Sequence, residues 1–331
     1  MGLNKLEEEF FSSAATLEEK ITKAIDQLVN SNNSYFCTYL IREKEIKSPE
    51  FAKAALKANI FYPSILYQNA APETRDQLIY LLDQEQINQS DVNNGLLALA
   101  MIGDEKVVEY FKKWEENPPA WRKDLFTGPY GYAMEGNWCI EDGQKKSLIY
   151  NTCYAIEQVD TCLPNENIFG GASKDICPYC GSNYINMLVI DGKDERLAFL
   201  GLHGKIKIKY CDSCLPWEEF LYCKYEEDQE STVIHHTNGC GELCEEEMIN
   251  KQKPFIISKK PVSNCYCDPF DKCAIGGAPS FVDDAKFASC PNCGKRMKHL
   301  AQLGEEWTTC GTEYIQICTD CKIAAVTYQQ T

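Results

Sequence analysis

The chain has 331 residues, of which 44% are hydrophobic and 25% charged, and a formal net charge of −16. This length suits about two domains of ordinary globular composition, and no apolar run is long enough to predict a membrane span. Acidic residues exceed basic residues in both 1–136 and 137–331. Such a surface repels phosphate backbones, which disfavours nucleic acid as a partner.

The N-terminal residues carry no recognisable targeting signal. Met1 to Lys5 lead towards three glutamates rather than into the apolar core of a signal peptide. Leu6 stands where N-myristoylation at Gly2 would require serine or threonine. We therefore expect a cytoplasmic protein with no membrane anchor, in a reducing compartment that favours thiolate–metal sites over disulfides.

Residues 1–116 are predicted to form a helical-repeat region of HEAT-like type. Thr16 and Glu19 have the spacing of a capping box at the start of a helix. Gly103 suits the end of a helix, and Asp104 suits the start of the next one. Apolar residues recur at helical spacing in four stretches, 17–28, 73–82, 92–99 and 107–114. Short helices joined by tight turns are typical of stacked repeats, although no clean fixed period is present.

Residues 117–164 are predicted to be an ordered connector packed between the two parts of the chain. Pro118 and Pro119 end the last helix, because proline has no N–H group to donate. The connector is rich in glycine and aromatic residues, including Trp121 and Trp138. We interpret these aromatic side chains as packing residues rather than as a ligand cage.

Residues 165–331 are predicted to form a β-rich region. Lys205–Tyr210 and Tyr314–Ile317 alternate polar and apolar residues, as half-buried strands do. Arg196–Leu200 and Ala324–Tyr328 are further candidate strands. This change of pattern from helical spacing to strand alternation predicts an α+β fold, with the helices in the first part and the strands in the second.

Two units, at about 165–225 and 265–331, repeat the same order of parts. In each unit a Gly-Gly turn precedes a Cys-x2-Cys pair, an apolar run, an alternating strand and a second Cys-x2-Cys pair. This order indicates an internal duplication within one domain. We therefore expect a helical-repeat region followed by a duplicated β-rich region with four-cysteine zinc sites.

Eighteen of the nineteen cysteines lie in 137–331, and eight of them form four Cys-x2-Cys pairs. The pairs predict a first set of Cys177, Cys180, Cys211 and Cys214 and a second set of Cys290, Cys293, Cys318 and Cys321. Two residues between cysteines allow a tight turn that aims both thiolates at one ion. Two such turns complete a closed tetrahedral site, so we expect two zinc ions with a structural rather than a catalytic role. Iron can occupy a four-cysteine site too, but zinc is the more common metal there.

The other cysteines follow no regular spacing. Cys240, Cys244, Cys265, Cys267 and Cys273, near His235 and His236, form a candidate third metal site, with unligated thiols as the alternative. Cys37, Cys139, Cys153, Cys162, Cys223 and Cys310 are interpreted as packing residues. His203 and His299 lie in or near apolar runs, and we interpret them as core or surface histidines.

Enzyme signatures are weak in this sequence. Cys177-Pro-Tyr-Cys180 matches a glutaredoxin active-site string, but a strand rather than a helix is predicted after it. The His-Glu-x-x-His string of zinc hydrolases is absent, as are the His-x-Glu and Pro-Cys-x-x-Cys strings of deaminases. A thiol-redox or metal-dependent enzyme that uses the irregular cysteine cluster 240–273 stays open as the alternative function.

The chain resembles the YwqG-like family of uncharacterised bacterial proteins. The motifs that carry the resemblance are Arg196–Leu202, Ile275–Pro279, Cys290–Met297, Leu300–Leu303, Tyr314–Cys321 and Ala325–Thr331. The resemblance implies membership of a longer subgroup, in which a helical-repeat segment precedes the zinc-binding region. The duplicated layout is more distantly similar to the programmed-cell-death-2 proteins, which are similar to chaperones for a ribosomal protein. Ser280–Val282 stand where YwqG-like proteins often have Trp-x-Gln, and the cluster 240–273 is extra, so a shared ligand surface is not implied.

The function that we expect is binding of a protein partner by an adaptor, an immunity-type protein or a chaperone-like holder. Helical repeats present concave binding surfaces, the metal sites are closed, and no nucleophile–base pair stands out. The acidic charge would suit a basic partner. Lys205, Lys207 and Lys209 are the only support for nucleic-acid binding, and we interpret them as a solvated strand face.

Overall fold

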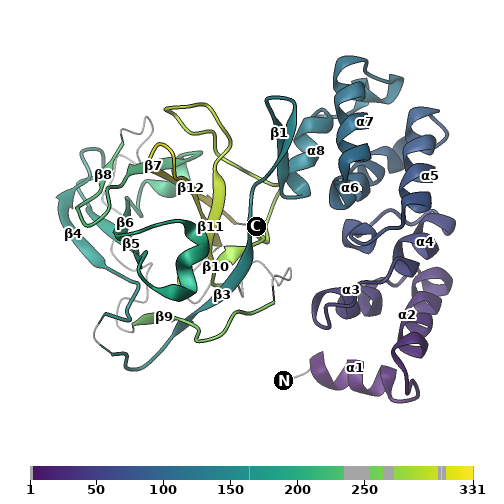
Figure 1. The fold of residues 1–331 in the computed structure, drawn as a ribbon, viewed down its shortest axis with the longest axis horizontal. Helices are drawn as coiled ribbons and strands as arrows, with labels where there is room; N and C mark the ends of the chain where they lie inside the picture. The colour runs from purple at the N-terminus through teal and green to yellow at the C-terminus, as the bar shows by residue number, and fades with distance from the viewer. Residues whose placement is uncertain are drawn as a thin grey trace. The chain divides into compact units, whose positions relative to one another are not determined.

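Helices fill the first part of the chain and β-strands the second (Figure 1). The protein is described by a computed structural model over residues 3–163, 165–234, 254–263, 272–304, 307 and 311–330. The chain divides into two compact units, Met1–Lys146 and Ser147–Thr331. The mixed α+β class is therefore as predicted, and the boundary between the units lies within the stretch 117–164.

The first unit consists of short helices that pack against their neighbours in chain order. Its α-helices are α1 (Leu3–Phe11), α2 (Leu17–Ser31), α3 (Tyr35–Arg42), α4 (Glu50–Lys57), α5 (Pro72–Asp83), α6 (Val92–Ile102), α7 (Glu105–Glu116) and α8 (Pro129–Glu135). Helix α2 packs on α3 and α4, α5 packs on α4 and α6, and α8 packs on α6 and α7. The HEAT-like repetition stays a prediction. None of the described helices is long and apolar enough to cross a membrane.

The predicted helix ends are confirmed by their hydrogen bonds. The backbone N–H of Glu19 donates to Thr16 Oγ1 at 3.2 Å, and the N–H of Thr16 donates to Glu19 Oε2 at 2.9 Å. Gly103 ends α6 with φ of +53°, a conformation that glycine adopts without strain. Asp104 Oδ1 then accepts the N–H of Val107 at 3.0 Å and begins α7.

The tryptophans of the expected connector pack within the first unit. Trp121 is buried and its Nε1 donates to the carbonyl of Leu82 at 3.0 Å. Trp138 is also buried, and its Nε1 donates to the carbonyl of Ala100 at 2.8 Å. Trp138 opens a short hairpin of β1 (Trp138–Glu141) and β2 (Gln144–Ser147). The interpretation of these aromatic residues as packing residues is confirmed.

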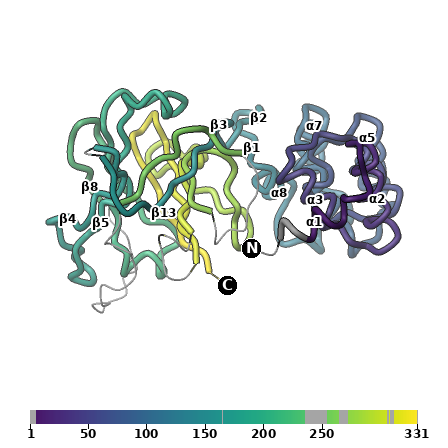
Figure 2. The backbone as a smooth tube through the Cα atoms, turned by 90° about the horizontal axis from the view of Figure 1, so that it is seen from below, coloured from purple at the N-terminus to yellow at the C-terminus, as the bar shows by residue number. Residues whose placement is uncertain are grey.

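The second unit contains two antiparallel sheets (Figures 1 and 2). Its strands are β3 (Tyr150–Gln158), β4 (Gly171–Ile176), β5 (Asn183–Asp191), β6 (Lys205–Tyr210), β7 (Leu221–Lys224), β8 (Thr232–Val233), β9 (Phe255–Ile257), β10 (Ala274–Gly277), β11 (Lys298–Leu303), β12 (Thr312–Cys318) and β13 (Ile323–Gln329). The large sheet has the order β8-β7-β13-β12-β11-β10-β3-β9, and the small sheet has the order β4-β5-β6.

One apolar core contains residues from both sheets of the second unit. The small sheet contributes Met187, Leu188 and Ile208, and the large sheet contributes Ile315 and Val326, all of them fully buried. Lys205–Tyr210 and Tyr314–Ile317 are strands, as predicted, but Tyr314–Ile317 is buried on both faces rather than half-buried. The same order of strand and cysteine pair runs through β4–β7 and through β10–β13.

The strand predicted at Arg196–Leu200 is wrong, because these residues belong to a 3-10 helix, Glu195–Leu200. The side chain of Asp194 accepts the N–H of Arg196 at 3.0 Å and so caps the helix start. Gly201, with φ of +69°, ends the helix. The buried residues of this segment, Leu197 and Leu200, are three residues apart, which is the period of a 3-10 turn rather than the two-residue period of a strand.

Buried glutamines on the large sheet hold the segment 278–289, which leads to the third Cys-x2-Cys pair. The side chain of Gln302 bonds the backbone of Ser280. That of Gln316 bonds the backbone of Lys286 and Ala288. That of Gln329 bonds the backbone of Val282, Asp283 and Asp284. Gln302 and Gln316 are fully buried. A buried amide that bonds both N–H and C=O groups replaces the pairing that a neighbouring strand would supply.

Replacing Gln316 tests this arrangement. In Gln316→Leu, the N–H of Ala288 loses its acceptor at 2.6 Å and the carbonyl of Lys286 loses its donor at 2.7 Å. We expect the free energy of unfolding to fall by about 1–3 kcal/mol, the cost of leaving buried polar groups unpaired. Denaturant unfolding measures this, with the exposed Gln229→Leu as the matched control. An effect no larger than that of the control would contradict the role of Gln316.

Candidate metal centres

The first cysteine set lies at the ends of two strands of the small sheet. Cys177 and Cys180 follow β4, and Cys211 and Cys214 follow β6, with β5 between these two strands. The structure brings together all four sulfur atoms within 4.8 Å of one another. Cys180 Sγ lies 3.4 Å from Cys211 Sγ, and Cys177 Sγ lies 3.8 Å from Cys214 Sγ.

The second cysteine set occupies the corresponding place on the large sheet. Cys290 and Cys293 lie before β11, Cys318 is the last residue of β12, and Cys321 lies in the turn before β13. Their four sulfur atoms also lie within 4.8 Å of one another. Cys293 Sγ and Cys318 Sγ are 3.9 Å apart. All eight cysteines selected from the sequence are therefore gathered into the two predicted groups.

The first pair of each set forms the same tight turn. The N–H of Cys177 donates to the carbonyl of Ser182 at 2.8 Å, and the N–H of Gly181 donates back to the carbonyl of Cys177 at 2.9 Å. Cys290 and Gly294 make the equivalent bonds at 2.8 Å each. Gly181 and Gly294 have φ of +76° and +74°, which glycine adopts without strain. The turn thus depends on the glycine that follows each Cys-x2-Cys pair.

The sulfur separations fit a tetrahedral metal ion. Zinc–sulfur bonds of about 2.3 Å in a tetrahedron place the sulfur atoms about 3.8 Å apart. The measured separations of 3.4, 3.8 and 3.9 Å lie close to this value. They also exceed the S–S bond length of a disulfide, about 2.05 Å. The donor set of four sulfur atoms suits zinc, and these eight residues would hold two zinc ions.

The two sets differ in their exposure to solvent. All four cysteines of the first set are buried, with no side chain more than 5% exposed. In the second set only Cys290 is buried, Cys318 and Cys321 are half-buried, and Cys293 is exposed. The same donor set and the same turn therefore occur once inside the main core and once near the surface.

Burial and hydrogen bonding set the thiol pKa values of the first set in opposite directions. Burial raises the pKa of Cys180, but hydrogen bonds with the side chain and backbone of Ser182 and with Cys211 and Cys214 together outweigh it and bring the pKa to about 7. Burial raises the pKa of Cys211, and its hydrogen bond to Cys180 adds to the effect. Metal ions bind thiolates, so a positive ion would favour ionisation of the whole set.

A buried carboxyl group connects the first set to the large sheet. The hydroxyl of Tyr210 lies 3.1 Å from Glu313 Oε1 and 3.1 Å from Asp212 Oδ1. Tyr210 and Asp212 flank Cys211 along the chain, whereas Glu313 lies on β12. Burial raises the pKa of Glu313 well above its ordinary value, and the nearby charge of Asp212 raises it further. The sequence carries no local signal for this contact.

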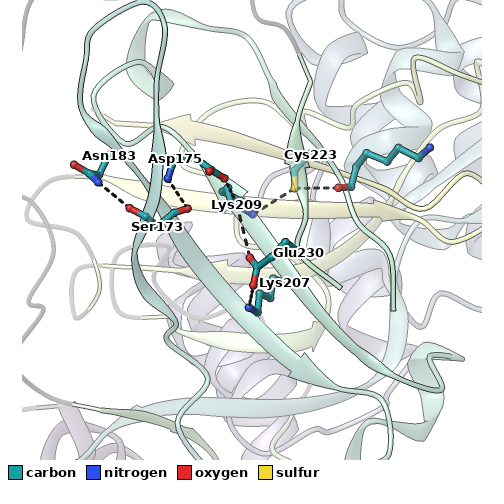
Figure 3. A network of polar contacts seen from close by, with 8 residues as sticks. Ser173, Asp175, Asn183, Lys207, Lys209, Cys223 and Glu230 are labelled. Atoms are coloured by element: carbon teal, nitrogen blue, oxygen red, sulfur yellow. Dashed lines mark hydrogen bonds and ion pairs between the residues drawn. The ribbon is translucent and has the colours of Figure 1, made fainter. Parts of the chain in front are cut away.

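A buried lysine links the two strands that carry the first set (Figure 3). Lys209 on β6 is only 1% exposed, and its Nζ donates to Asp175 Oδ2 on β4 at 2.6 Å. A carboxylate oxygen of Glu230 lies 3.9 Å from the same nitrogen. The hydrogen bond from Lys209 holds the pKa of Asp175 below its ordinary value. The interpretation of all three strand lysines as a solvated face is therefore wrong for Lys209.

The candidate third metal site cannot be assembled from the described residues. Cys240, Cys244, Cys265 and Cys267 lie outside them, as do His235 and His236. Cys273 is described, is buried, and its Sγ accepts the N–H of Gly304 at 3.2 Å. The candidate third site therefore stays a prediction.

The remaining described cysteines and histidines lie where the packing interpretation expects them, except that Cys162 is only half-buried. Cys37, Cys139, Cys153 and Cys223 are buried, Cys162 is half-buried, and Cys310 lies outside the described residues. His299 is fully buried, and burial together with the charge of Lys272 lowers its pKa to about 3. His203 is exposed. A core histidine and a surface histidine agree with the sequence interpretation, but the ring nitrogens of His299 have no hydrogen-bond partner among the described residues, so this histidine is not the satisfied core residue that the interpretation expects.

An uncharacterised bacterial protein is similar to this chain over almost its whole length. The chain is 26% identical, over 346 aligned residues, to the uncharacterised protein YpfL of Salmonella typhimurium. The alignment covers 98% of this chain and 75% of the relative. No family model matches the chain, and no solved structure matches it. The similarity therefore includes both the helical unit and the cysteine-containing unit.

Single serine substitutions at equivalent positions test the two metal centres. Cys180→Ser and Cys293→Ser each remove the second thiolate of a first pair, one in each set. We expect zinc content to fall from two ions per chain to one in either variant, because three thiolates no longer complete the site. Metal analysis of protein purified under reducing conditions measures this. Cys223→Ser, a buried cysteine outside both sets, is the control and should keep two zinc ions.

Glu313→Gln tests the buried carboxyl group. The folded-state pKa of Glu313 is raised, so as pH rises above the ordinary glutamate range the unfolded chain ionises first and folding loses free energy. The stability advantage of Glu313→Gln should grow with pH, by at most about 1.4 kcal/mol per pH unit. Denaturant unfolding at several pH values between 6 and 8 measures this advantage. Glu195→Gln on the surface is the control, and a variant less stable than wild type at pH 8 would contradict the account.

Proposed function

We propose that this chain is a zinc-stabilised protein-binding protein, in the manner of an adaptor, an immunity-type protein or a chaperone-like holder. The observation that carries the proposal is that each cysteine set supplies four sulfur atoms at tetrahedral spacing. Four protein ligands leave no position for water or a substrate, so the metal would stabilise the fold. We also propose that the chain belongs with the YwqG-like proteins, on the motifs of its second unit.

Charge and exposed side chains support a protein as the partner. The net charge of −16 favours a partner with a basic surface, through long-range attraction. Phe126 in the first unit is fully exposed, and Trp217 in the second is 65% exposed. Aromatic side chains are enriched at protein interfaces, where they supply much of the binding energy. Such side chains are otherwise costly to leave in water.

The partner can be sought with the zinc-loaded chain as bait. We expect a basic protein to be retained by wild-type chain and released as salt is raised, because screening weakens attraction between exposed charges. Recovery should fall in a Phe126→Ser/Trp217→Ser double variant that keeps two zinc ions and the wild-type unfolding midpoint. Tyr62→Ser, at another exposed aromatic residue, is a matched control for loss of apolar surface.

The outcomes of this experiment are distinct. Salt-sensitive retention of one basic protein, lost in the double variant, would support the proposal. Equal recovery by wild type and by the double variant would show that Phe126 and Trp217 do not contribute to binding of the partner. Equal retention of basic and neutral proteins would contradict the preference for a basic partner.

A further inference from the structure

The two cysteine sets have the same four sulfur ligands but differ in how far those cysteines are exposed to solvent. Cys177, Cys211 and Cys214 of the first set are fully buried, and Cys180 is 5% exposed. Cys293 of the second set is exposed, and Cys318 and Cys321 are half-buried. A dissolved oxidant can therefore reach thiolates of the second set directly, whereas the first set is reached only when the core opens.

The apolar surroundings of the second set are also less extensive than those of the first set. The first set belongs to the main apolar core, together with large side chains such as Tyr210 and Leu215. The second set borders a small separate cluster whose buried members are Ala288, Cys290, Met297, Ile323 and Ala325. Opening of this small cluster exposes less apolar surface than opening of the main core. The second set is thus the less protected of the two.

The contacts within the second set select two of its thiols. Cys293 Sγ and Cys318 Sγ are 3.9 Å apart, so a small movement would bring them to bonding distance. Cys321 Sγ accepts a hydrogen bond from Asn292 Nδ2 at 3.2 Å and Cys318 Sγ accepts one from the backbone of Cys321, so the short distance to Cys293 is what favours Cys318. Cys290 is buried and is held by the backbone bonds of its tight turn. Cys293 is therefore the cysteine most accessible to an oxidant, and Cys318 is placed to form a disulfide with it.

We propose that the second cysteine set is an oxidation site for hydrogen peroxide, at which Cys293 and Cys318 form a disulfide and the zinc ion is lost. The first set keeps its zinc ion under the same conditions. This inference rests on the proposed zinc sites and adds a means by which one of them is regulated.

The oxidation balances in two steps. The Cys293 thiolate attacks one oxygen of peroxide, the O–O bond breaks, and a sulfenic acid forms with hydroxide, which takes a proton to become water. The Cys318 thiolate then attacks the sulfenic sulfur, the S–S bond forms, and a second hydroxide leaves and is protonated. Two thiolates lose two electrons in total, and one peroxide becomes two water molecules. The set then keeps two thiolates, too few to hold zinc in a closed site.

Loss of this site would uncover the small cluster. Met297 follows the first pair of the set, and Ile323 follows the second pair. Both side chains are buried in the small cluster. Without the metal, the turn at 290–293 would still be joined to the sheet by β11, which begins at Lys298, and by the ion pair of Lys295 with Asp320. We therefore expect oxidation to expose apolar surface beside the sheet while both main sheets stay folded.

The experiment starts from full-length chain with a measured content of two zinc ions. Hydrogen peroxide is added, and released zinc is followed with a colorimetric chelator, while mass spectrometry locates disulfides and an apolar-surface dye reports exposure. We expect one of the two zinc ions to leave in a first phase, a Cys293–Cys318 disulfide, and a rise in dye binding. A reductant together with zinc should restore the starting state.

Two matched variants identify the site. In Cys180→Ser, which lacks the first site, the remaining zinc should leave in the first phase. In Cys293→Ser, which lacks the second site, the remaining zinc should resist peroxide. If either variant does not fold, brief alkylation of wild-type chain gives the same answer, because cysteines of the second set should be labelled before those of the first.

The outcomes separate this inference from the proposed function. A zinc content below two in untreated chain would contradict the proposed metal sites themselves. Two zinc ions that leave together, or from the first set first, would overturn the inference but leave the metal sites standing. Resistance of both sites to peroxide would also overturn it.

Discussion

The gathering of eight thiols into two groups of four is the constraint on which the second unit depends. Each group joins a turn to the end of a neighbouring strand: the turn between β4 and β5 to the end of β6, and the turn before β11 to the turn between β12 and β13. Four sulfur atoms so close together would repel one another as thiolates, and a divalent cation neutralises that repulsion. A metal ion held by each group would therefore fix the position of its turns relative to one another.

The two groups are not independent stabilisers, because their sheets share contacts. The pair of Tyr210 and Glu313 joins the end of β6 to β12, and β7 pairs with β13 although β7 belongs to the first run of strands. Lys209 and Asp175 reinforce the first group from the side, since their ion pair crosses β5 beside the cysteines. A chain that repeats one order of parts has in this way formed one core from both copies. The two cysteine groups nevertheless differ in depth, because the first is buried and the second is partly exposed.

The sequence was sufficient for features that depend on neighbouring residues. The Cys-x2-Cys pairs, the capping box of Thr16 and Glu19, and the boundary at Gly103 and Asp104 are local patterns with a direct physical meaning, and the structure confirms them. Features that depend on distant residues were beyond its reach. Lys209 is buried because Asp175, far away along the chain, meets it, and Glu313 is buried because Tyr210 covers it. The exposure of Cys293 likewise depends on what packs around its turn, and spacing alone carries no information about that.

The position of β13 within the large sheet bears on how the protein is made. This strand lies between β7 and β12, so the sheet is divided into separate pieces until β13 enters. A ribosome delivers residues 221–224 well before residues 323–329, and during that interval one edge of β7 has no partner. Open edges recruit other extended chains. Nascent molecules on one messenger would be most vulnerable to pairing with each other in this interval.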